Sequence, residues 1–504
     1  LALLKETVRG EGLGFEHHSQ WALEPQTLPT IILPKDHTGF MERVPPEAFG
    51  FFQSFHMGTF AVFFLCVGLL FLPRKEIRFW LIVFCAGLFF SLGKYNPFYE
   101  FVYNWFPPLK LFRYPEKFYI FSAFAQIFLV GHVADELLQK SGKRAGFFMV
   151  LAVLCAAILG SSLLVPGSKP LPSLAVLTIF AGLGYLFFSG KTTATALKTA
   201  LLLLIFFDLT MKHYMLIPMI DKKFFEKEPA VATQVKQDKE LFRVYSGDVA
   251  DNQDSMTIPP DADSYLLRRI IVKERLRPAM GMTYGISSPY GLAGMGLELQ
   301  DVWLWGSVFR QSPPEKRMRI LQRGNVKYLV TGDETAIEGR VQALDNVLPR
   351  AFLVPKWRLG EDPKLLNTYY DETFDPRQEV LLSEPAIANT SADFAGKVQV
   401  VQYEANRVII QSHQNGDGFL VLLDSWFPGW TATVDGTPEH IYRANHFYRA
   451  VKTGPGTHTV EFSFEPPGFR PGPGQGTTTA ASPRHRRPTR SSMKTPAPLL
   501  DSNS

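Results

Sequence analysis

Two basic side chains, Arg113 and Lys117, lie four residues apart at the end of an aromatic, proline-rich segment, Gly93–Phe118. If a helix begins at Pro115, both lie beside its positively polarised N-terminus, where phosphate oxygens bind readily. The segment itself suits a loop that packs on a membrane surface. Arg113 and Lys117 are therefore candidates for binding a lipid phosphate. Alternatively, they only extend their charged ends from the interface into water.

A carboxylate, Asp208, interrupts the otherwise apolar run Leu201–Leu209. An ionisable group at membrane depth is costly and marks a functional site by default. The alternative is that Asp208 lies near the outer end of its helix, capped or hydrated, with Lys212 one turn later on the same face. The sequence leaves both interpretations open.

Aromatic residues near the C-terminal end could form a platform on which a sugar ring stacks. The candidates are Trp426, Trp430, Tyr442 and Phe447, with Asp424, Arg443 and Asn445 to bind sugar hydroxyls. Alternatively, these aromatics fill a thin core, since aromatic side chains carry most of the buried area of a small domain.

Metal and cofactor sites are not indicated. The adjacent His17 and His18 point in different directions on a helix or strand, with no third ligand nearby in the sequence. Cys66, Cys85 and Cys155 fall in apolar runs and form no zinc or disulfide pattern. The sequence has no dinucleotide-binding glycine motif, P-loop or nucleophile elbow. We therefore expect no metal and no cofactor.

The helices that must position Arg113, Lys117 and Asp208 are apolar runs of nearly spanning length. Six runs approach the roughly 20 mostly apolar residues that cross a bilayer. They are Met57–Leu72, Ile77–Gly93, Phe118–Ala134, Gly146–Pro166, Leu171–Gly190 and Leu197–Pro218. Their succession excludes a wholly soluble protein and predicts a transmembrane domain over residues 57–218.

The short loops between these runs predict the orientation of the domain. Loops on one side carry eight basic residues and those on the other side carry five. The positive-inside rule places the more basic side in the cytoplasm. The opening loop, residues 1–56, and everything after Met219 then lie outside the cytoplasmic membrane.

Beyond Met219 the sequence is typical of soluble domains. Short buried strands at Leu241–Tyr245 and Val326–Val330 and a helix at Pro314–Arg323 indicate an α/β subdomain over residues 219–395. Seven short strands then predict a small antiparallel β-sandwich over residues 396–470. They are Lys397–Tyr403, Arg407–Ser412, Phe419–Ser425, Trp430–Val434, Glu439–Tyr442, Phe447–Lys452 and His458–Phe464. Between two of them, Asp435-Gly436 is a strong hairpin signal.

The last segment, residues 471–504, is rich in Pro, Ser, Thr, Arg and Gly and is predicted to be a disordered basic tail. The chain has a net charge of +5, and this tail supplies +4 of it, as five basic residues against one acidic residue. The rest of the chain is close to neutral, which argues against a nucleic-acid partner.

Several segments resemble the YfhO family of bacterial polytopic membrane proteins. The resemblance rests on Leu111–Phe118 (LFRYPEKF), Gly93–Tyr99, Asn325–Thr331, Leu348–Val354 and Asp424–Asp435. The opening segment, Glu16–Pro34, is similar to the family's large outer loop ahead of a spanning helix. These motifs are specific to the family but not to a reaction.

The resemblance implies a GT-C-like architecture. Such proteins transfer sugars from polyprenyl-phosphate donors to cell-envelope acceptors, and their catalytic acidic residue typically lies in a first outer loop near the N-terminus. We expect this chain, which begins at Leu1 without an initiator Met, to be a fragment that lacks that loop. The catalytic role is therefore assigned to none of Glu16, Glu100 and Asp208. The family commonly continues with a further spanning helix after the equivalent of Phe469-Arg470, so the different tail suggests a shifted reading frame.

Together these features predict a polytopic α-helical membrane domain (GT-C-like) followed by an extracytoplasmic α/β subdomain and a small antiparallel β-sandwich, in a bacterial cytoplasmic membrane. The expected function is that of a GT-C-type glycosyltransferase, here without its catalytic acid. Its expected partners are membrane lipids, a polyprenyl-phosphate sugar and an envelope glycan. The alternative is a non-catalytic envelope assembly or export factor whose outer domain binds glycan or protein.

Overall fold

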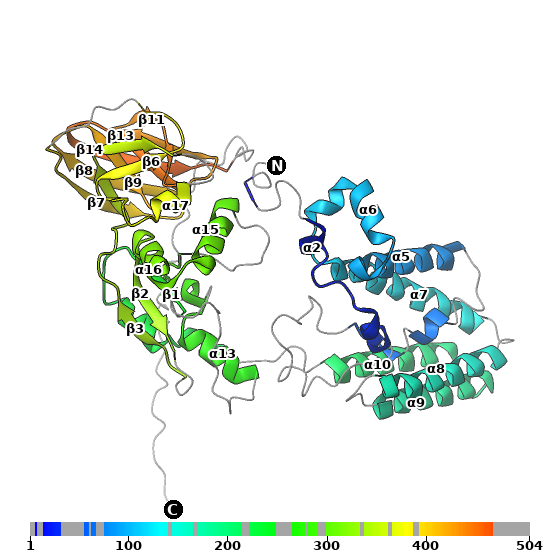
Figure 1. Ribbon diagram of the computed structural model, residues 1–504. Coiled ribbons are helices and arrows are strands. Elements are labelled where there is room, and N and C mark those ends of the chain that lie inside the picture. Colours follow the sequence, from blue (N-terminus) through cyan, green and yellow to red (C-terminus); the bar gives the residue numbers. More distant parts are fainter. Residues whose placement is uncertain are drawn as a thin grey trace, which may run out of the picture.

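The computed structural model has a helical lobe (described residues 14–213) and a β-rich lobe (described residues 221–466), as Figure 1 shows. The described residues are 6–7, 14–31, 55–59, 62–66, 75–139, 144–164, 170–213, 221–247, 265–277, 280–289, 299–332, 337–360, 365–386 and 393–466. The predicted tail at 471–504 lies outside them, as do residues 60–61 and 67–72 of the run predicted at Met57–Leu72.

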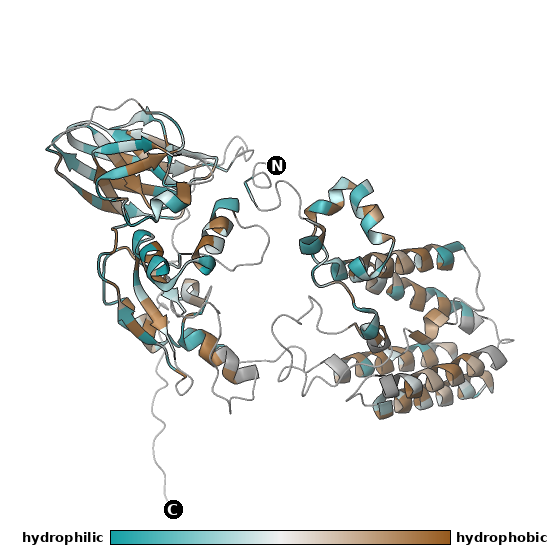
Figure 2. Ribbon diagram, in the orientation of Figure 1, coloured by the Kyte–Doolittle hydropathy of each residue, from teal (hydrophilic) through white to brown (hydrophobic). Residues whose placement is uncertain are grey.

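Three helices of the helical lobe are long and apolar enough to cross a membrane. They are Pro115–Glu136, Pro170–Phe188 and Ala194–Met211. These stretches belong to α7 (Tyr119–Gln139, with the 3₁₀ turn Pro115–Phe118 before it), α9 (Pro170–Phe188) and α10 (Ala194–His213). Figure 2 shows the hydrophobic colouring of this lobe. Three of the six predicted runs are thereby confirmed as helices of spanning length.

The other predicted runs form helices that the structure does not establish as spans. The helix α5 (Lys75–Ser91) has 17 residues, and α8 (Arg144–Leu164) contains a shorter apolar stretch, Phe147–Gly160. In the first predicted run, Thr59 and residues 62–66 are helical. A domain with six spans therefore stays a prediction.

The outer surfaces of α7 and α10 are apolar. Exposed large hydrophobic side chains include Ile120, Phe124 and Ile127 on α7 and Leu202, Leu203 and Phe206 on α10. Soluble monomers rarely expose contiguous apolar patches of this kind. These faces are consistent with contact between the helical lobe and lipid chains.

Two glycines let helices of this lobe approach closely. Gly87 of α5 faces α7, where an added Cβ would lie 2.6 Å from Ser122 Oγ and 2.8 Å from the Ser122 backbone nitrogen. The Ser122 hydroxyl donates to the carbonyl oxygen of Phe84 at 2.7 Å. On α9, an added Cβ at Gly184 would lie 2.7 Å from the ring of Phe147 on α8. Small residues at such crossings are typical of helices that pack in membranes.

The start of α7 and the last turns of α10 lie at the same end of the helical lobe. The Tyr119 hydroxyl donates to the carbonyl oxygen of Phe55 at 2.5 Å, and the backbone N–H of Thr59 donates to Asp208 at 2.8 Å. The four residue-to-residue steps from Phe55 to Thr59 span at most about 14 Å. The loop at 93–118, hereafter the surface loop, therefore lies at the end from which the chain leaves α10 toward the β-rich lobe.

The β-rich lobe begins with a small α/β unit. The strand β1 (Arg243–Ser246) pairs in parallel with β2 (Val326–Thr331), and β2 pairs in antiparallel with β3 (Arg340–Ala343). The helix predicted at Pro314–Arg323 is α16, with the same bounds. The further helices are α11 (Lys223–Glu226), α12 (Ala230–Val235), α13 (Tyr265–Glu274), α14 (Met280–Thr283), α15 (Gln300–Gln311) and α17 (Leu365–Tyr369).

Two sheets then form a sandwich. The six-stranded sheet has the order β4-β9-β13-β12-β6-β5, and the five-stranded sheet has the order β11-β10-β14-β8-β7. The strands are β4 (Ala351–Val354), β5 (Lys356–Leu359), β6 (Glu379–Leu382), β7 (Gly396–Tyr403), β8 (Arg407–Gln414), β9 (Gly418–Leu422), β10 (Trp430–Val434), β11 (Thr437–Glu439), β12 (Tyr442–Ala444), β13 (Tyr448–Thr453) and β14 (Gly456–Phe464). All neighbours are antiparallel except β5 and β6. Because β4, β5 and β6 precede residue 396, the sandwich extends across the boundary predicted at 395/396.

The strand β9, inside the six-stranded sheet, is buried on both faces. Leu420 and Leu422 of β9 face the core shared with the five-stranded sheet. Phe419 and Val421 of the same strand belong to the core shared with α15, α16 and α17. A strand buried on both faces is apolar throughout, which explains the continuous run FLVLL at residues 419–423.

The predicted hairpin at Asp435-Gly436 is confirmed. Both residues have positive φ, +53° and +81°, and Val434 of β10 pairs with Thr437 of β11 across the turn. Two consecutive residues with positive φ are the signature of the type I′ turn, whose twist matches that of the flanking strands.

Candidate functional site

Arg113 and Lys117 flank one aromatic ring at the start of the candidate span Pro115–Glu136. The guanidinium carbon of Arg113 lies 4.6 Å, and the ammonium nitrogen of Lys117 4.8 Å, from the ring centroid of Tyr114. The helix begins with one 3₁₀ turn at Pro115, the start that the lipid-phosphate interpretation assumes. The two cations therefore gather at the positive end of the helix dipole, an arrangement that favours an anion. The first-turn N–H groups are already paired, because that of Glu116 donates to the carbonyl oxygen of Trp21 at 3.3 Å and that of Lys117 to the carbonyl oxygen of Tyr114 at 3.0 Å.

Tyr114 is held in place by the segment at residues 14–31. The ring of Trp21 stacks on it with centroids 4.2 Å apart, and the Tyr114 N–H donates to the carbonyl oxygen of His18 at 3.2 Å. Tyr114 has a φ of +68°, which turns the chain sharply into α7. Arg113 Nη2 also donates to Gln20 Oε1 at 2.5 Å. We call this group the cation–aromatic cluster: Gln20, Trp21, Arg113, Tyr114 and Lys117.

A glycine allows the same segment to approach the start of α7. Gly93 has a φ of +45°, and an added Cβ would lie 2.8 Å from both Ala22 Cβ and Pro115 Cγ. A side chain at position 93 would therefore push the segment at 14–31 away from Pro115. The cation–aromatic cluster depends on this close contact.

Both ring nitrogens of His18 form hydrogen bonds with residues of the surface loop. Its Nδ1 lies 2.7 Å from the carbonyl oxygen of Phe112, and its Nε2 lies 2.7 Å from the hydroxyl of Tyr99. Burial lowers the pKa of His18, which keeps the ring neutral at neutral pH. Its neighbour His17 is exposed. Within the described ranges, no group of three or more His, Cys, Asp or Glu side chains could hold a metal ion.

Asp208 caps the start of another helical stretch. Its side chain is buried, with Oδ2 accepting the Thr59 N–H at 2.8 Å and Oδ1 lying 3.4 Å from the Thr59 hydroxyl. Gly58, with a φ of +93°, precedes this contact, and an added Cβ there would lie 3.6 Å from Asp208 Oδ2. A carboxylate at a helix N-terminus satisfies backbone N–H groups and interacts favourably with the helix dipole. Asp208 therefore has a structural partner, the start of a neighbouring helical stretch, that the sequence did not indicate.

The predicted glycan-binding residues do not share one set of contacts: Trp426 and Trp430 each lie beside a different arginine. Trp426 lies beside Arg443, whose guanidinium carbon is 5.7 Å from the indole centroid. Trp430 instead lies 3.7 Å from the guanidinium carbon of Arg449. Asn445 is fully buried, and its Oδ1 accepts a backbone hydrogen bond from β6 at 2.9 Å. Asn445 therefore joins the β12–β13 turn to β6.

Arg443 fastens α15 to the sandwich. Its guanidinium forms an ion pair with Asp301 of α15, and its Nε donates to the carbonyl oxygen of His446 at 2.5 Å. His446 Nε2 lies 3.2 Å from Asp301 Oδ1. Of the other proposed platform residues, Phe447 is buried in the core and Tyr442 packs on it. Most of these residues thus have structural contacts, as the core interpretation predicts.

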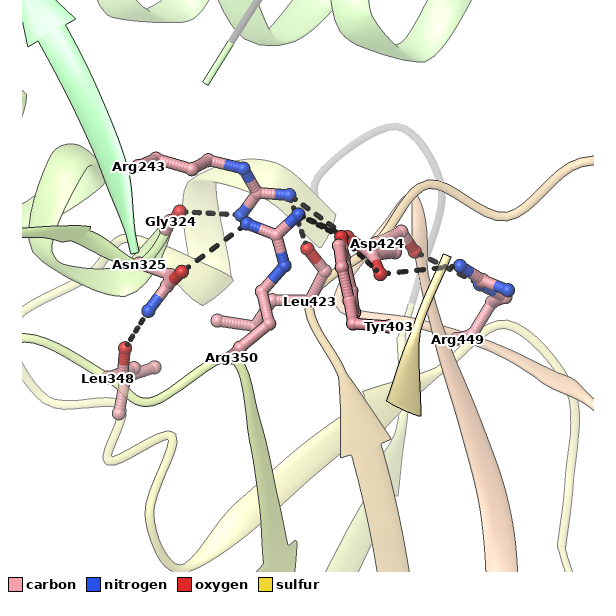
Figure 3. A network of polar contacts seen from close by, with 9 residues as sticks. All are labelled: Arg243, Gly324, Asn325, Leu348, Arg350, Tyr403, Leu423, Asp424 and Arg449. Atoms are coloured by element: carbon pink, nitrogen blue, oxygen red, sulfur yellow. Dashed lines mark hydrogen bonds and ion pairs between the residues drawn. The ribbon is translucent and has the colours of Figure 1, made fainter. Parts of the chain in front are cut away.

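Asp424 lies at the centre of a buried ion network (Figure 3). Its oxygens are 2.8 Å from Arg350 Nη2, 3.3 Å from Arg243 Nη2 and 3.5 Å from Arg449 Nη2. The Tyr403 hydroxyl donates to it at 3.0 Å. Burial alone would raise the pKa of Asp424, but the three arginines and the Tyr403 hydrogen bond hold this pKa below its usual range. Burial lowers the pKa of Arg449 to about 10, so its guanidinium is still charged at neutral pH.

The same network connects the α/β unit to both sheets. Arg243 of β1 donates to the carbonyl oxygens of Gly324 and Leu423 at 2.8 and 2.6 Å. Arg350, just before β4, donates to Asn325 Oδ1 at 3.3 Å and also to the Tyr403 hydroxyl of the five-stranded sheet. The network therefore joins elements of all three sheets.

Sequence reasoning assigned Asp424 to sugar hydroxyls and missed its partners Arg243, Arg350, Tyr403 and Arg449. Arg243 and Asp424 are 181 residues apart, so no spacing rule connects them. The sequence does show that Arg243 and Asp424 each adjoin apolar strand residues. Because a charge in a buried strand needs a partner, this position predicts that each residue is paired, but not with which residue.

The geometry assigns different roles to the candidate residues. Asp208, Asp424, Arg443 and Asn445 hold elements of the fold together, as their contacts show. Arg113 and Lys117 lie where an anion is favoured, so the cation–aromatic cluster is the candidate binding site. No family model, no curated protein and no solved structure matches this chain.

Proposed function

We propose that the chain is part of a YfhO-like, polytopic membrane glycosyltransferase of GT-C-like architecture, and that the cation–aromatic cluster binds the phosphate of its polyprenyl-phosphate sugar donor. The observation that carries the proposal is the gathering of Arg113 and Lys117 around Tyr114 at the N-terminus of a candidate span. A lipid carrier presents its phosphate at the membrane surface. Its hydrocarbon chain would then lie along the exposed apolar face of α7, next to Ile120 and Phe124.

The proposed role of the cluster is to stabilise a leaving group. When the bond between the sugar and the carrier phosphate breaks, negative charge grows on the phosphate oxygens. Two cations fixed in advance at the positive end of the helix dipole stabilise that charge without reorganising. We assign the general base to neither Asp208 nor Asp424, because Asp208 caps a helix and Asp424 is surrounded by three arginines.

The same proposal places the β-rich lobe outside the cytoplasmic membrane of a bacterium, where it would face an envelope acceptor. The surface loop and the exit from α10 share one end of the helical lobe, which supports a common side for the cluster and the β-rich lobe. Glu404 is exposed in the β-rich lobe. We expect Glu404→Cys to react with a membrane-impermeant maleimide in intact cells. Reaction only after lysis would contradict this orientation.

Carrier binding tests the site directly. The full chain is reconstituted in phosphatidylcholine nanodiscs and titrated with polyprenyl phosphate. We expect the double variant Arg113→Ala/Lys117→Ala to weaken binding by at least about tenfold, since charge-assisted hydrogen bonds are roughly twice as strong as neutral ones. Lys198→Ala is the matched control, because Lys198 is an exposed lysine of the same lobe that pairs with Asp135 at 2.8 Å.

The outcomes separate a binding site from an anchor. Weaker carrier binding in the double variant, with the control unchanged, supports the proposal. Unchanged carrier binding with a lower yield of membrane-inserted protein would overturn it and leave only interfacial anchoring. Inorganic phosphate competing as well as the carrier would show that the lipid part is not recognised.

The second candidate is a non-catalytic envelope assembly or export factor whose outer lobe binds glycan or protein. The observation that favours it is Trp426, which is partly exposed beside Arg443 at one end of the sandwich. Turnover of a polyprenyl-phosphate sugar by membranes containing the protein favours the transferase. Glycan binding that is lost in Trp426→Ala, without any turnover, favours the second candidate.

A further inference from the structure

The short helix α6 (Tyr99–Trp105) has a face that packs on the protein. Tyr99 and Tyr103, four residues apart, are buried against α2 (Phe15–His18). The imidazole centroid of His18 lies 5.6 Å from the ring of Tyr99 and 4.9 Å from that of Tyr103. With the hydrogen bond from Tyr99 to His18, these contacts fix the rotation of α6 about its axis. Figure 1 shows α6 beside α2.

A second face of this segment is aromatic and uncovered. Phe101 and Trp105, also four residues apart, are 70% and 74% exposed, and Phe98, just before α6, is 67% exposed. At 3.6 residues per turn these three side chains lie on one side, away from Tyr99 and Tyr103. Glu100 and Asn104, both exposed, form a polar edge between the two aromatic faces. The segment therefore has a protein face, a polar edge and an aromatic face.

The exposed area of the aromatic face is large enough to suggest a function. Three aromatic side chains that are about two-thirds exposed present about 400 Å², as large as the largest apolar patch on a typical monomer, which is often functional. The segment lies between the end of α5 and the start of the candidate span at Pro115. That position is the level of the membrane surface, where aromatic residues accumulate.

Basic groups lie elsewhere in the surface loop. The ammonium nitrogens of Lys94 and Lys110 lie 5.5 and 5.4 Å from the ring centroids of Tyr95 and Tyr103. The surface loop contains four basic residues and two acidic ones. The basic residues are Lys94, Lys110, Arg113 and Lys117, and the acidic residues are the exposed Glu100 and the buried Glu116. Basic clusters beside a membrane attract anionic lipid headgroups.

We infer that Phe98, Phe101 and Trp105 form an interfacial anchor that inserts into a bilayer surface rich in anionic phospholipid, with α2 holding the aromatic face toward the lipid. This anchor does not depend on the carrier-binding proposal, because it uses a different face of the surface loop and binds bulk lipid. Its consequence is that the cation–aromatic cluster is held at a fixed depth.

Spin labels on α6 test the inference. In the full chain with Cys66, Cys85 and Cys155 replaced by Ser, a nitroxide is placed at Phe101→Cys, at Glu100→Cys on the polar edge, or at Met282→Cys in the β-rich lobe, where Met282 is 67% exposed. Each protein is reconstituted in nanodiscs of phosphatidylcholine, with or without one quarter phosphatidylglycerol. Collision rates with oxygen, which concentrates in lipid, are compared with those of a water-soluble nickel chelate.

We expect the ratio of oxygen to nickel collisions at position 101 to exceed the ratios at 100 and 282 by at least about threefold, and to increase with phosphatidylglycerol. Equal ratios at 100 and 101 would overturn the anchor, since no side of α6 would then face lipid. Spin–spin broadening at position 101 would also overturn it, by showing that a second copy of the chain covers this face. A depth independent of phosphatidylglycerol would overturn the preference for anionic lipid.

Discussion

The two lobes bury a carboxylate in different ways. In the helical lobe, Asp208 accepts hydrogen bonds from the backbone N–H and the hydroxyl of Thr59 at the start of a helical stretch. In the β-rich lobe, Asp424 is surrounded by three guanidiniums and one phenol. One carboxylate uses a helix N-terminus and the other uses charged side chains.

The difference follows from the donors that each kind of structure leaves available. The first N–H groups of a helix have no intrahelical partner, so they can bind a carboxylate without a buried countercharge. A strand inside a sheet uses its N–H groups in the ladder, so a buried carboxylate there needs side-chain donors. Guanidiniums at membrane depth are also costly. Asp208, among apolar helices, is therefore paired with a helix N-terminus, and Asp424, beside a sheet, is paired with arginine side chains.

The largest expected effect comes from neutralising Asp424. Asp424→Asn leaves three buried arginines without their counterion, and breaking a buried pair in this way costs about 3–5 kcal/mol. We expect hydrogen exchange of β9 and β13 amides in the full chain to accelerate accordingly, with the helical lobe unchanged. Glu404→Gln, at an exposed carboxylate, is the control. An equal effect in both lobes would show that the network does not act locally.

The pH dependence of this lobe follows from the same carboxylate. The folded-state pKa of Asp424 is lowered, so its contribution is present above the ordinary carboxyl pKa of about 4 and is lost as the pH falls through the lower folded value. We therefore expect the wild-type lobe to lose stability below about pH 4, and Asp424→Asn to flatten that part of the profile. Thermal unfolding midpoints between pH 2.5 and 7, roughly the range that brackets both pKa values, would measure it.

Packing in the helical lobe is tested at Gly87. Gly87→Ala places a Cβ 2.6 Å from Ser122 Oγ and 2.8 Å from its backbone nitrogen, and overpacking of this kind costs about 1–3 kcal/mol. Gly131→Ala is matched, because an added Cβ there meets nothing within 4 Å and alanine in a helix is favoured by about 0.5–1 kcal/mol. Thermal unfolding in detergent should move in opposite directions for the two variants. A shift in the same direction would contradict the close crossing of α5 and α7.

Two substitutions at Asp208 distinguish a cap from a charge. Asp208→Ala removes the acceptor for the Thr59 N–H and should cost about 1–2 kcal/mol, as loss of a helix cap does. Asp208→Asn keeps an acceptor oxygen and should retain most of that stability. If the negative charge itself were needed, the two variants would behave alike. Hydrogen exchange at residues 62–66 and the thermal midpoint report the difference.

The smallest effect is expected at an exposed ion pair of the β-rich lobe. The hydrogen bond to Asp435, at 2.7 Å, raises the pKa of His458. The pair therefore stabilises fully below the ordinary histidine pKa of about 6.5, and this contribution is lost as the pH rises through the higher folded value. We expect Asp435→Asn to return the His458 titration, followed by NMR of selectively labelled histidine, toward its ordinary value. An unchanged titration would mean that the pair does not form in solution.

Local patterns predicted several elements correctly. Apolar runs predicted the helices α7, α9 and α10, because a span needs about 20 apolar residues in succession. A helix start at Pro115, which the lipid-phosphate interpretation only assumed, is also observed, since proline is favoured in a first turn. The pair Asp435-Gly436 predicted its hairpin, because a type I′ turn needs positive φ at both positions. Each of these signals lies within one segment of chain.

The tertiary structure alone decided which distant residues meet. The three arginines around Asp424 come from three separate strand regions, and β4 to β6 join a sheet whose other strands lie beyond residue 396. The cation–aromatic cluster likewise needs Trp21 and Gln20 from a segment about 90 residues before Arg113. The sequence by itself determined helices, turns and strand tendencies, because these depend on neighbouring residues. Contacts between segments far apart in the chain depend on how whole elements pack, and sequence spacing carries no record of that packing.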